Sequence, residues 1–217
     1  MRSISDTGVQ DERTFTETAR RAQIVSAAID TIAELGYGQA SLARIAERAG
    51  TGKGVIAYHF DGKEELMRAL LADVLAQAQE YMRPRILAES TGAGMLRAWI
   101  ESNLAYMAEH RNHLIAIVEI ARSARAADGN PLFDSSILEG GVAGGRELLA
   151  RFQRSGEFRA DFDPQVMAMA IRAAIDAVPP RLTRDPGLDV NHYGRELAKL
   201  FDLATRGERS RTRRRHR

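Results

Sequence analysis

Residues 41–60 read SLARIAERAGTGKGVIAYHF, and this stretch decides the fold of the N-terminal part of the chain. Ser41 can cap a short helix, because its hydroxyl accepts a hydrogen bond from an early helical N–H. Ala46 is small enough for a second helix to cross closely, and Gly50 tolerates the positive φ of a tight turn. Ile56 follows six residues later and can fill the space between the helices. This spacing predicts a helix-turn-helix.

A helix-turn-helix leaves one side of its second helix free to enter the major groove of DNA. The residues predicted to face the groove are Thr51, Gly52, Lys53, Gly54, Val55 and Ala57. Lys53 is the clearest base-reading candidate, because lysine commonly pairs with guanine O6 and N7. The helix has few other side-chain donors, so readout would also use backbone contacts, thymine methyl groups and DNA shape. The alternative is an ordinary helical hairpin, since Ala, Gly and Ile at these intervals also occur by chance.

The continuation GVIAYHFDGKEEL, residues 54–66, resembles the signature of the TetR family of regulators, and the resemblance extends over residues 16–70. In that family the recognition helix ends in an aromatic pair, and a lysine begins the fourth helix after a short turn. The resemblance implies that three residues contact DNA phosphates: Tyr58, His59 and Lys63. It also places Ser41 near the DNA backbone and Thr51 and Lys53 nearest the bases.

Two further points follow from this resemblance. Core packing is the alternative for Tyr58 and His59, and it is the prediction for Phe60. The segment is similar to the BetI-like branch of the family, a similarity confined to the DNA-binding part that says little about effectors.

The remaining sequence predicts helices only. Thr14–Glu17 has the pattern of a capping box, and the helix that follows ends at Gly36. A long fourth helix begins at Lys63 and ends before Pro84. Apolar residues at helical spacing then predict helices at 94–109, 111–126, 137–155, 164–177 and 190–205. The predicted fold is all-α: an N-terminal three-helix head with the helix-turn-helix, joined by a long helix to a C-terminal helical ligand-binding and dimerisation bundle.

Four regions are expected along the chain. They are a flexible arm (1–13), a helix-turn-helix DNA-binding domain (14–62), a regulatory and dimerisation domain (63–205) and a disordered Arg-rich tail (206–217). The tail carries seven arginines against Glu208, a net charge of +6, whereas the whole chain is +2. Residues 1–205 therefore sum to −4, and the basic pI is no argument that the folded part binds DNA. The tail either adds salt-sensitive affinity for DNA or is a solvated end without a partner.

The regulatory domain is predicted to bind a small ligand and to dimerise, as the resemblance implies. The dimer helices would be 164–177 and 190–205, although their apolar residues could equally form an intramolecular core. The candidate pocket residues combine polar and apolar side chains at helical spacing: Trp99, Asn103, Tyr106, Met107, Glu119 and Arg122. Core or surface positions are the alternative for each of these residues. The glycines of residues 140–145 lack the following Lys-Ser/Thr of a phosphate loop and predict close helix contact or a local break instead.

The composition and the motifs of the chain argue against several other classes of protein. The chain has no cysteine, which excludes disulfides and cysteine-based metal sites, and it shows neither a signal peptide nor an apolar run long enough to cross a membrane. We therefore expect a cytoplasmic protein. An enzyme is not predicted, since no catalytic motif is visible, and His110 and His113 lack a third metal ligand; no cofactor or metal is expected.

The sequence thus predicts a homodimeric DNA-binding regulator, a repressor that leaves a palindromic operator when a small-molecule effector binds. The alternative is an architectural or constitutive DNA-binding protein without an effector, and an activating role is also left open. The sequence does not identify the effector, the operator or the regulated genes.

Overall fold

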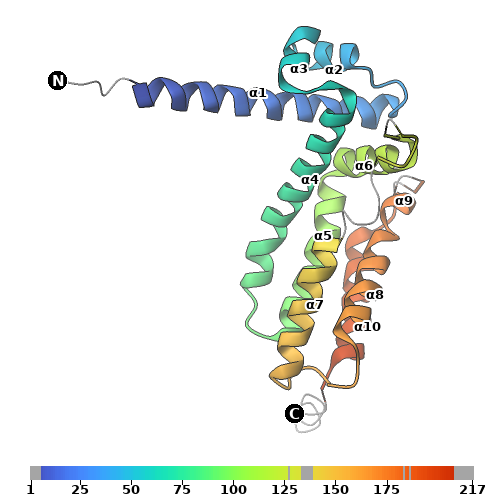
Figure 1. Cartoon of the computed structure of the whole chain (residues 1–217). Helices are drawn as coiled ribbons and strands as arrows, with labels where there is room; N and C mark the ends of the chain where they lie inside the picture. The colour runs from blue at the N-terminus through green and yellow to red at the C-terminus, as the bar shows by residue number, and fades with distance from the viewer. Residues whose placement is uncertain (1–5, 127, 133–138, 183, 186, 208–217) are drawn as a thin grey trace, which may run out of the picture. The chain divides into compact units, whose positions relative to one another are not determined.

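The computed structural model describes residues 6–126, 128–132, 139–182, 184–185 and 187–207, with side chains described from residue 16 onward except at 139–140 (Figure 1). All regular elements among these residues are α-helices, which confirms the all-α fold class. The chain forms two compact units. The first, here called the head unit, comprises Met1–Val74 and Ile115–Leu132, and the second, the bundle unit, comprises Leu75–Leu114 and Phe133–Arg217.

The head unit contains α1 (Asp6–Leu35), α2 (Leu42–Arg48), α3 (Lys53–His59) and parts of two longer helices, α4 (Gly62–Leu87) and α6 (Arg111–Ser123). Its core consists of side chains that recur at helical spacing on α1, α2, α3 and the first part of α4. The largest of these are fully buried: Ile24, Ile32, Ile45, Ile56, Phe60, Leu66, Met67 and Leu70. The burial of Phe60 confirms its predicted core position.

Several helix limits differ from the sequence prediction, and two differ most. The first helix begins at Asp6, eight residues before Thr14; this segment contains no proline, although Gly8 disfavours a helix. Helix α4 continues through Pro84 to Leu87, whereas an end before Pro84 was expected. A proline inside a helix removes only one backbone hydrogen bond, and neighbouring turns can keep the helix continuous. The arm, domain and tail limits proposed from the sequence stay predictions, and residues 208–217 of the tail lie outside the described residues.

The bundle unit is built around α5 (Gly92–Glu109), which packs against α7 (Glu139–Arg154), α8 (Pro164–Asp176) and α10 (Val190–Thr205). The N-terminal N–H groups of α5, α8 and α10 are capped by the side chains of Thr91, Asp163 and Asp189. A short helix, α9 (Pro179–Leu182), forms where the sequence predicted only a break. Proline fits the first turn of a helix, so Pro179 starts this element.

Glycines allow the helices of the bundle unit to approach closely. A Cβ added to Gly145 would lie 2.8 Å from Trp99 Cζ3, and one added to Gly92 would lie 2.6 Å from Phe152 Cγ. Real Cβ atoms do not come so near a ring, so a side chain at either position would force the ring or the helix to shift. The expected close helix contact of the glycine-rich segment is confirmed at Gly145. None of the helices among the described residues is long and apolar enough to span a membrane.

Candidate nucleic-acid interface

The turn between α2 and α3 has the geometry that the sequence predicts. Ser41 Oγ accepts a hydrogen bond from the Arg44 N–H at 3.3 Å and caps α2. Gly50 adopts a φ of +62°, which residues with a side chain rarely do. Ala46 and Ile56 are buried, with 3% and 0% of their surface exposed. The predicted roles of these four residues in the helix-turn-helix are confirmed.

The outward side of α3 carries most of the predicted DNA-contacting residues. Those exposed to solvent are Gly52, Lys53, Gly54, Ala57 and Tyr58, whereas Thr51, Val55 and His59 are half-buried. The Tyr58 side chain is 74% exposed, so core packing does not explain it. Within the described part of the chain, Lys53 makes no hydrogen bond or ion pair. Its ammonium group is therefore available to a partner outside the chain.

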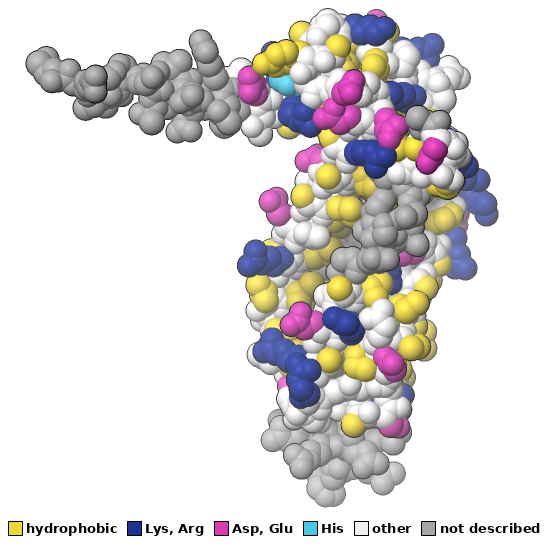
Figure 2. Space-filling model, viewed as in Figure 1, with side chains coloured by type: hydrophobic (Ala, Val, Ile, Leu, Met, Phe, Trp, Pro, Cys, Tyr) yellow, Lys and Arg dark blue, Asp and Glu magenta, His cyan; other side chains and the backbone are white. Residues whose placement is uncertain are grey.

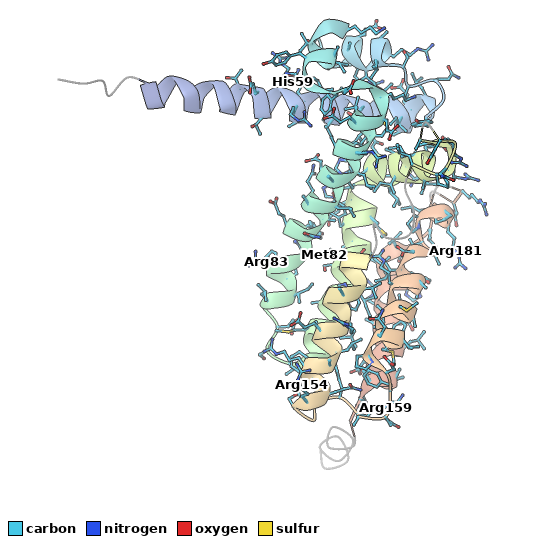
Figure 3. All side chains as sticks on the ribbon, in the orientation of Figure 1. His59, Met82, Arg83, Arg154, Arg159 and Arg181 are labelled. Carbon is cyan, nitrogen blue, oxygen red and sulfur yellow. The ribbon has the colours of Figure 1, made fainter. Side chains whose placement is uncertain are left out.

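Helix α1 holds the C-terminal ends of both short helices. Gln23 Nε2 donates to the Ala49 carbonyl at 2.9 Å, at the end of α2. Arg21 donates to the carbonyl of His59, the last residue of α3, which is labelled in Figure 3. The Arg21 guanidinium lies 4.2 Å from the centre of the Phe60 ring. These contacts satisfy carbonyls that a helix end leaves without an intrahelical partner. Sequence reasoning missed both residues, because a polar residue on α1 carries no local sign of the helix end it will contact.

Two predicted phosphate-contacting residues have partners within the chain. The Tyr58 hydroxyl donates to Glu17 Oε1 at 3.3 Å. Lys63 Nζ donates to the Tyr37 carbonyl at 2.8 Å and lies 4.0 Å from the centre of the Tyr37 ring. Burial lowers the pKa of Lys63 below its usual value. In this structure the Lys63 ammonium is directed to the turn after α1.

The surface of the head unit is not strongly basic. Residues 41–68 carry a net charge of +1. Basic and acidic side chains alternate over this part of the molecule (Figure 2), and Arg48 and Arg68 pair with Glu34 and Glu64. Affinity for phosphate would therefore depend on a few placed groups and not on a broad positive field.

The predicted ligand-pocket residues are divided between the two units. On α5 of the bundle unit, Trp99, Asn103 and Tyr106 are buried and Met107 is half-buried, with Trp99 in the core beside Gly145. The Tyr106 ring stacks on His110 at 4.1 Å, and its hydroxyl lies 3.1 Å from His113 Nδ1.

The other two candidates belong to the head unit. Glu119 Oε2 accepts a hydrogen bond from the Tyr37 N–H at 3.4 Å, and Arg122 is exposed. The structure therefore groups four of the six residues on one helix and assigns Glu119 a contact near the DNA-binding helices. The predicted helices at 94–109 and 111–126 already separated these two groups, but nothing in the sequence indicated that the second group belongs to the head unit.

Comparisons with known proteins agree with this geometry. Residues 24–70 match the model of the bacterial regulatory proteins of the tetR family. Over 86 residues the chain is 34% identical to the HTH-type transcriptional regulator BetI of Cronobacter sakazakii, which is 39% of this chain and 43% of that protein. The match thus spans less than half the length of this relative. The chain is also 27% identical to the fatty acid metabolism regulator protein of Bacillus subtilis, over 71% of this chain and 78% of that one.

Solved structures extend the likeness to the bundle unit. The transcriptional regulator FadR from Bacillus subtilis, in complex with stearoyl-CoA, aligns with a TM-score of 0.73 at 25% identity and covers 82% of this chain and 96% of its own. FadR from Bacillus halodurans aligns with the same TM-score at 23% identity, over the same shares of the two chains. The head with its helix-turn-helix and the helical C-terminal part therefore recur together in these proteins. Residues 24–70 therefore carry the DNA-binding segment of the tetR family of bacterial regulatory proteins.

Proposed function

We propose that this protein is a DNA-binding transcriptional regulator, a ligand-responsive repressor that binds a palindromic operator as a homodimer. The observation that carries the proposal is the outward side of α3 in the helix-turn-helix, where Lys53 is exposed and makes no hydrogen bond or ion pair with the residues that the structure describes. Such a surface fits the major groove, in which a recognition helix reads base edges. A chromosomal operator would place the protein in the cytoplasm.

The proposed contacts divide into two kinds. Lys53 reads base edges, and Val55 and Ala57 offer apolar contact to thymine methyl groups. Tyr58, with 74% of its side chain exposed, donates to a phosphate oxygen and exchanges its Glu17 partner for DNA. Gly52 and Gly54 have open space around the position of a Cβ, so the backbone of α3 can approach the duplex closely.

The proposed dimer surface lies on α8 and α10, which are neighbours because the Tyr193 hydroxyl donates to the Ala174 carbonyl at 3.2 Å. Four large apolar side chains of these helices are more than half exposed: Val166, Met169, Leu200 and Leu203. Solvent exposure of several large apolar residues on adjoining helices is typical of an interface. Two copies are also required by a palindromic site, since each recognition helix reads one half-site.

The proposed effector site is on α5. Asn103 and Tyr106 are buried polar residues of this helix, and Ser102 Oγ is the buried side-chain oxygen without a hydrogen-bond partner among the described residues. A buried hydroxyl without a partner is costly, so a bound effector that supplies one would gain affinity. Similarity to a FadR that was solved with stearoyl-CoA makes this acyl-CoA the first compound to test.

Selection of bound fragments from a pool of random duplexes tests the DNA-binding proposal. At physiological salt we expect recovered duplexes to share two inverted half-sites about one DNA turn, roughly 10 base pairs, apart. We expect specific duplexes to bind at least about a thousand-fold more tightly than random ones. Equal retention of every duplex would contradict a specific regulator and would favour an architectural DNA-binding protein.

A second measurement tests the ligand response. Stearoyl-CoA should raise the melting temperature of the protein and weaken its binding to the recovered duplex, because an effector shifts the population only if its affinities for the two states differ. A rise in melting temperature with unchanged duplex affinity would contradict release by this compound. A wider metabolite screen would then follow, with duplex release as its readout.

A further inference from the structure

The turn that follows α1 is held from two sides. Gly36 ends the helix with a φ of +77°, and Tyr37 comes next, half-buried. The Tyr37 carbonyl accepts the hydrogen bond from Lys63 Nζ at 2.8 Å, and the Tyr37 N–H donates to Glu119 Oε2 at 3.4 Å. Both backbone groups of one turn residue are thus bound by charged side chains that are distant in sequence.

The two side chains come from the two helices that continue from one unit into the other. Helix α4 passes between the units at Val74–Leu75, and α6 passes between them at Leu114–Ile115. Lys63 lies in the first turn of α4, and Glu119 lies in the part of α6 that belongs to the head unit. A movement of either helix along its axis would therefore pull on the same residue, Tyr37.

The chemistry around Glu119 favours a structural role at this turn. A cation would suit the C-terminal end of α1 better than a carboxylate, because the helix dipole is negative there. The Tyr37 N–H is the donor that compensates this cost. A Cβ on Gly36 would lie 3.4 Å from Glu119 Oε2, so the carboxylate is also in contact with the glycine that ends the helix.

We propose that Glu119 is a positioning residue for DNA binding, which holds the turn after α1 on α6 through the Tyr37 N–H. This proposal rests on the proposed function, because the head unit is taken to bind DNA. The turn leads directly into α2, whose N-cap is Ser41, so its position sets where the helix-turn-helix begins. Glu119 then transmits the state of α6 to the operator and does not contact the effector.

Three variants separate the hydrogen bond from the charge. Glu119→Gln keeps an oxygen acceptor at the same reach and loses the charge, whereas Glu119→Asp keeps the charge and is one methylene shorter. Glu119→Ala removes both. Glu80→Ala, at an exposed position of α4, is the control for loss of one negative charge.

Hydrogen exchange of the segment 36–40, measured by mass spectrometry on the full chain, is the first readout. The Ala and Asp variants should exchange the Tyr37 amide about five-fold faster than wild type, and the Gln variant should stay within about two-fold of it. Protection that is unchanged in all three Glu119 variants would overturn the proposal. This readout needs no DNA, so it stands even if the protein binds none.

Affinity for the duplex recovered from the random pool is the second readout. The Ala and Asp variants should bind about three- to ten-fold more weakly than wild type, and the Gln and Glu80→Ala variants should bind like wild type. The salt dependence of binding should be the same for all of them, because Glu119 neutralises no phosphate. If Glu119→Gln binds the duplex as weakly as Glu119→Ala, the charge of Glu119 and not its hydrogen bond affects DNA binding, and the proposal is wrong. If wild type binds the duplex and all three Glu119 variants match it, the proposal fails while the proposed function stands.

Discussion

The head unit and the bundle unit differ in how their sequence specifies function. In the head unit, residue spacing alone assigned a role to Ser41, Ala46, Gly50 and Ile56, and the structure confirms each role. In the bundle unit the same type of helical pattern left roles open. On α8, Ile171 is fully buried whereas Val166 is 62% exposed, although both are apolar and branched. A short motif fixes its own geometry, but the side of a helix that becomes the core depends on its neighbours.

The largest effect is expected at the exposed apolar surface of α8 and α10. These helices either form the dimer interface or contribute only to an intramolecular core, and a substitution on this surface distinguishes the two. Leu200→Arg should convert the proposed dimer into a monomer and weaken operator binding on the order of 100-fold, because a charge would be buried at the proposed interface. Analytical ultracentrifugation measures the first change and fluorescence anisotropy the second. The matched control is Leu87→Arg, since Leu87 is 63% and Leu200 62% exposed. A dimeric Leu200→Arg variant would show that the interface lies elsewhere.

The next effect tests whether the motif predicts function as well as geometry. Lys53→Ala should weaken operator binding about ten-fold or more and relax the preference at one base position of each half-site, because a base-edge contact is lost. Repeating the duplex selection with the variant measures both changes. Arg97→Ala, which removes a positive charge from an exposed position of α5, should change neither. If the Lys53→Ala variant keeps the same sequence preference, the backbone of α3 and the shape of the DNA determine that preference, and Lys53 does not.

The third prediction compares two adjacent glycines of α7 in the bundle unit, one in contact with a buried ring and one beside open space. Gly145→Ala should destabilise the fold by about 1–3 kcal/mol, because the new methyl group would overlap the Trp99 ring. Gly144→Ala meets open space and should stabilise the helix by about 0.5–1 kcal/mol. Denaturant unfolding followed by fluorescence measures both, since Trp99 is the single tryptophan. Equal stability of the two variants would mean that α5 and α7 can separate at no cost.

The smallest effect concerns a tertiary contact between α4 and α5. Burial, and then the 2.6 Å hydrogen bond to Glu109, raise the pKa of Tyr81 above its usual value of 10.0. A raised native pKa means that the folded state holds the phenolic proton more tightly than the unfolded chain. The resulting stability is fully present below pH 10 and is lost as the pH rises through the native pKa.

The corresponding experiment compares wild type with Tyr81→Phe. The melting temperature of wild type relative to the variant should fall as the pH rises above 10, where the unfolded chain loses the phenolic proton first, as measured by circular dichroism. A constant difference across this range would show that Tyr81 ionises equally in the folded and unfolded states. Tyr37, whose pKa is also raised by burial, is present in both proteins and does not affect the difference.

Lys63 shows that the position of a residue in the motif does not predict its hydrogen-bond partner. Its position relative to Tyr58 and Phe60 resembles that of a family phosphate contact, yet its ammonium binds the Tyr37 carbonyl in the structure. Arg21 and Gln23 show the reverse case, in which residues outside any motif hold the ends of α3 and α2. In each case the partner lies 26 or 38 residues away, a distance at which local spacing carries no information.

Local sequence patterns specify the helical class, the helix-turn-helix and the solvent-exposed side of α3, because these depend on turn chemistry and on periods of a few residues. Only the tertiary structure decided which apolar residues of α8 and α10 are buried, and that Glu119 contacts the turn after α1. The physical reason is that burial and long-range hydrogen bonds are properties of two surfaces in contact, and a linear pattern describes one surface at a time.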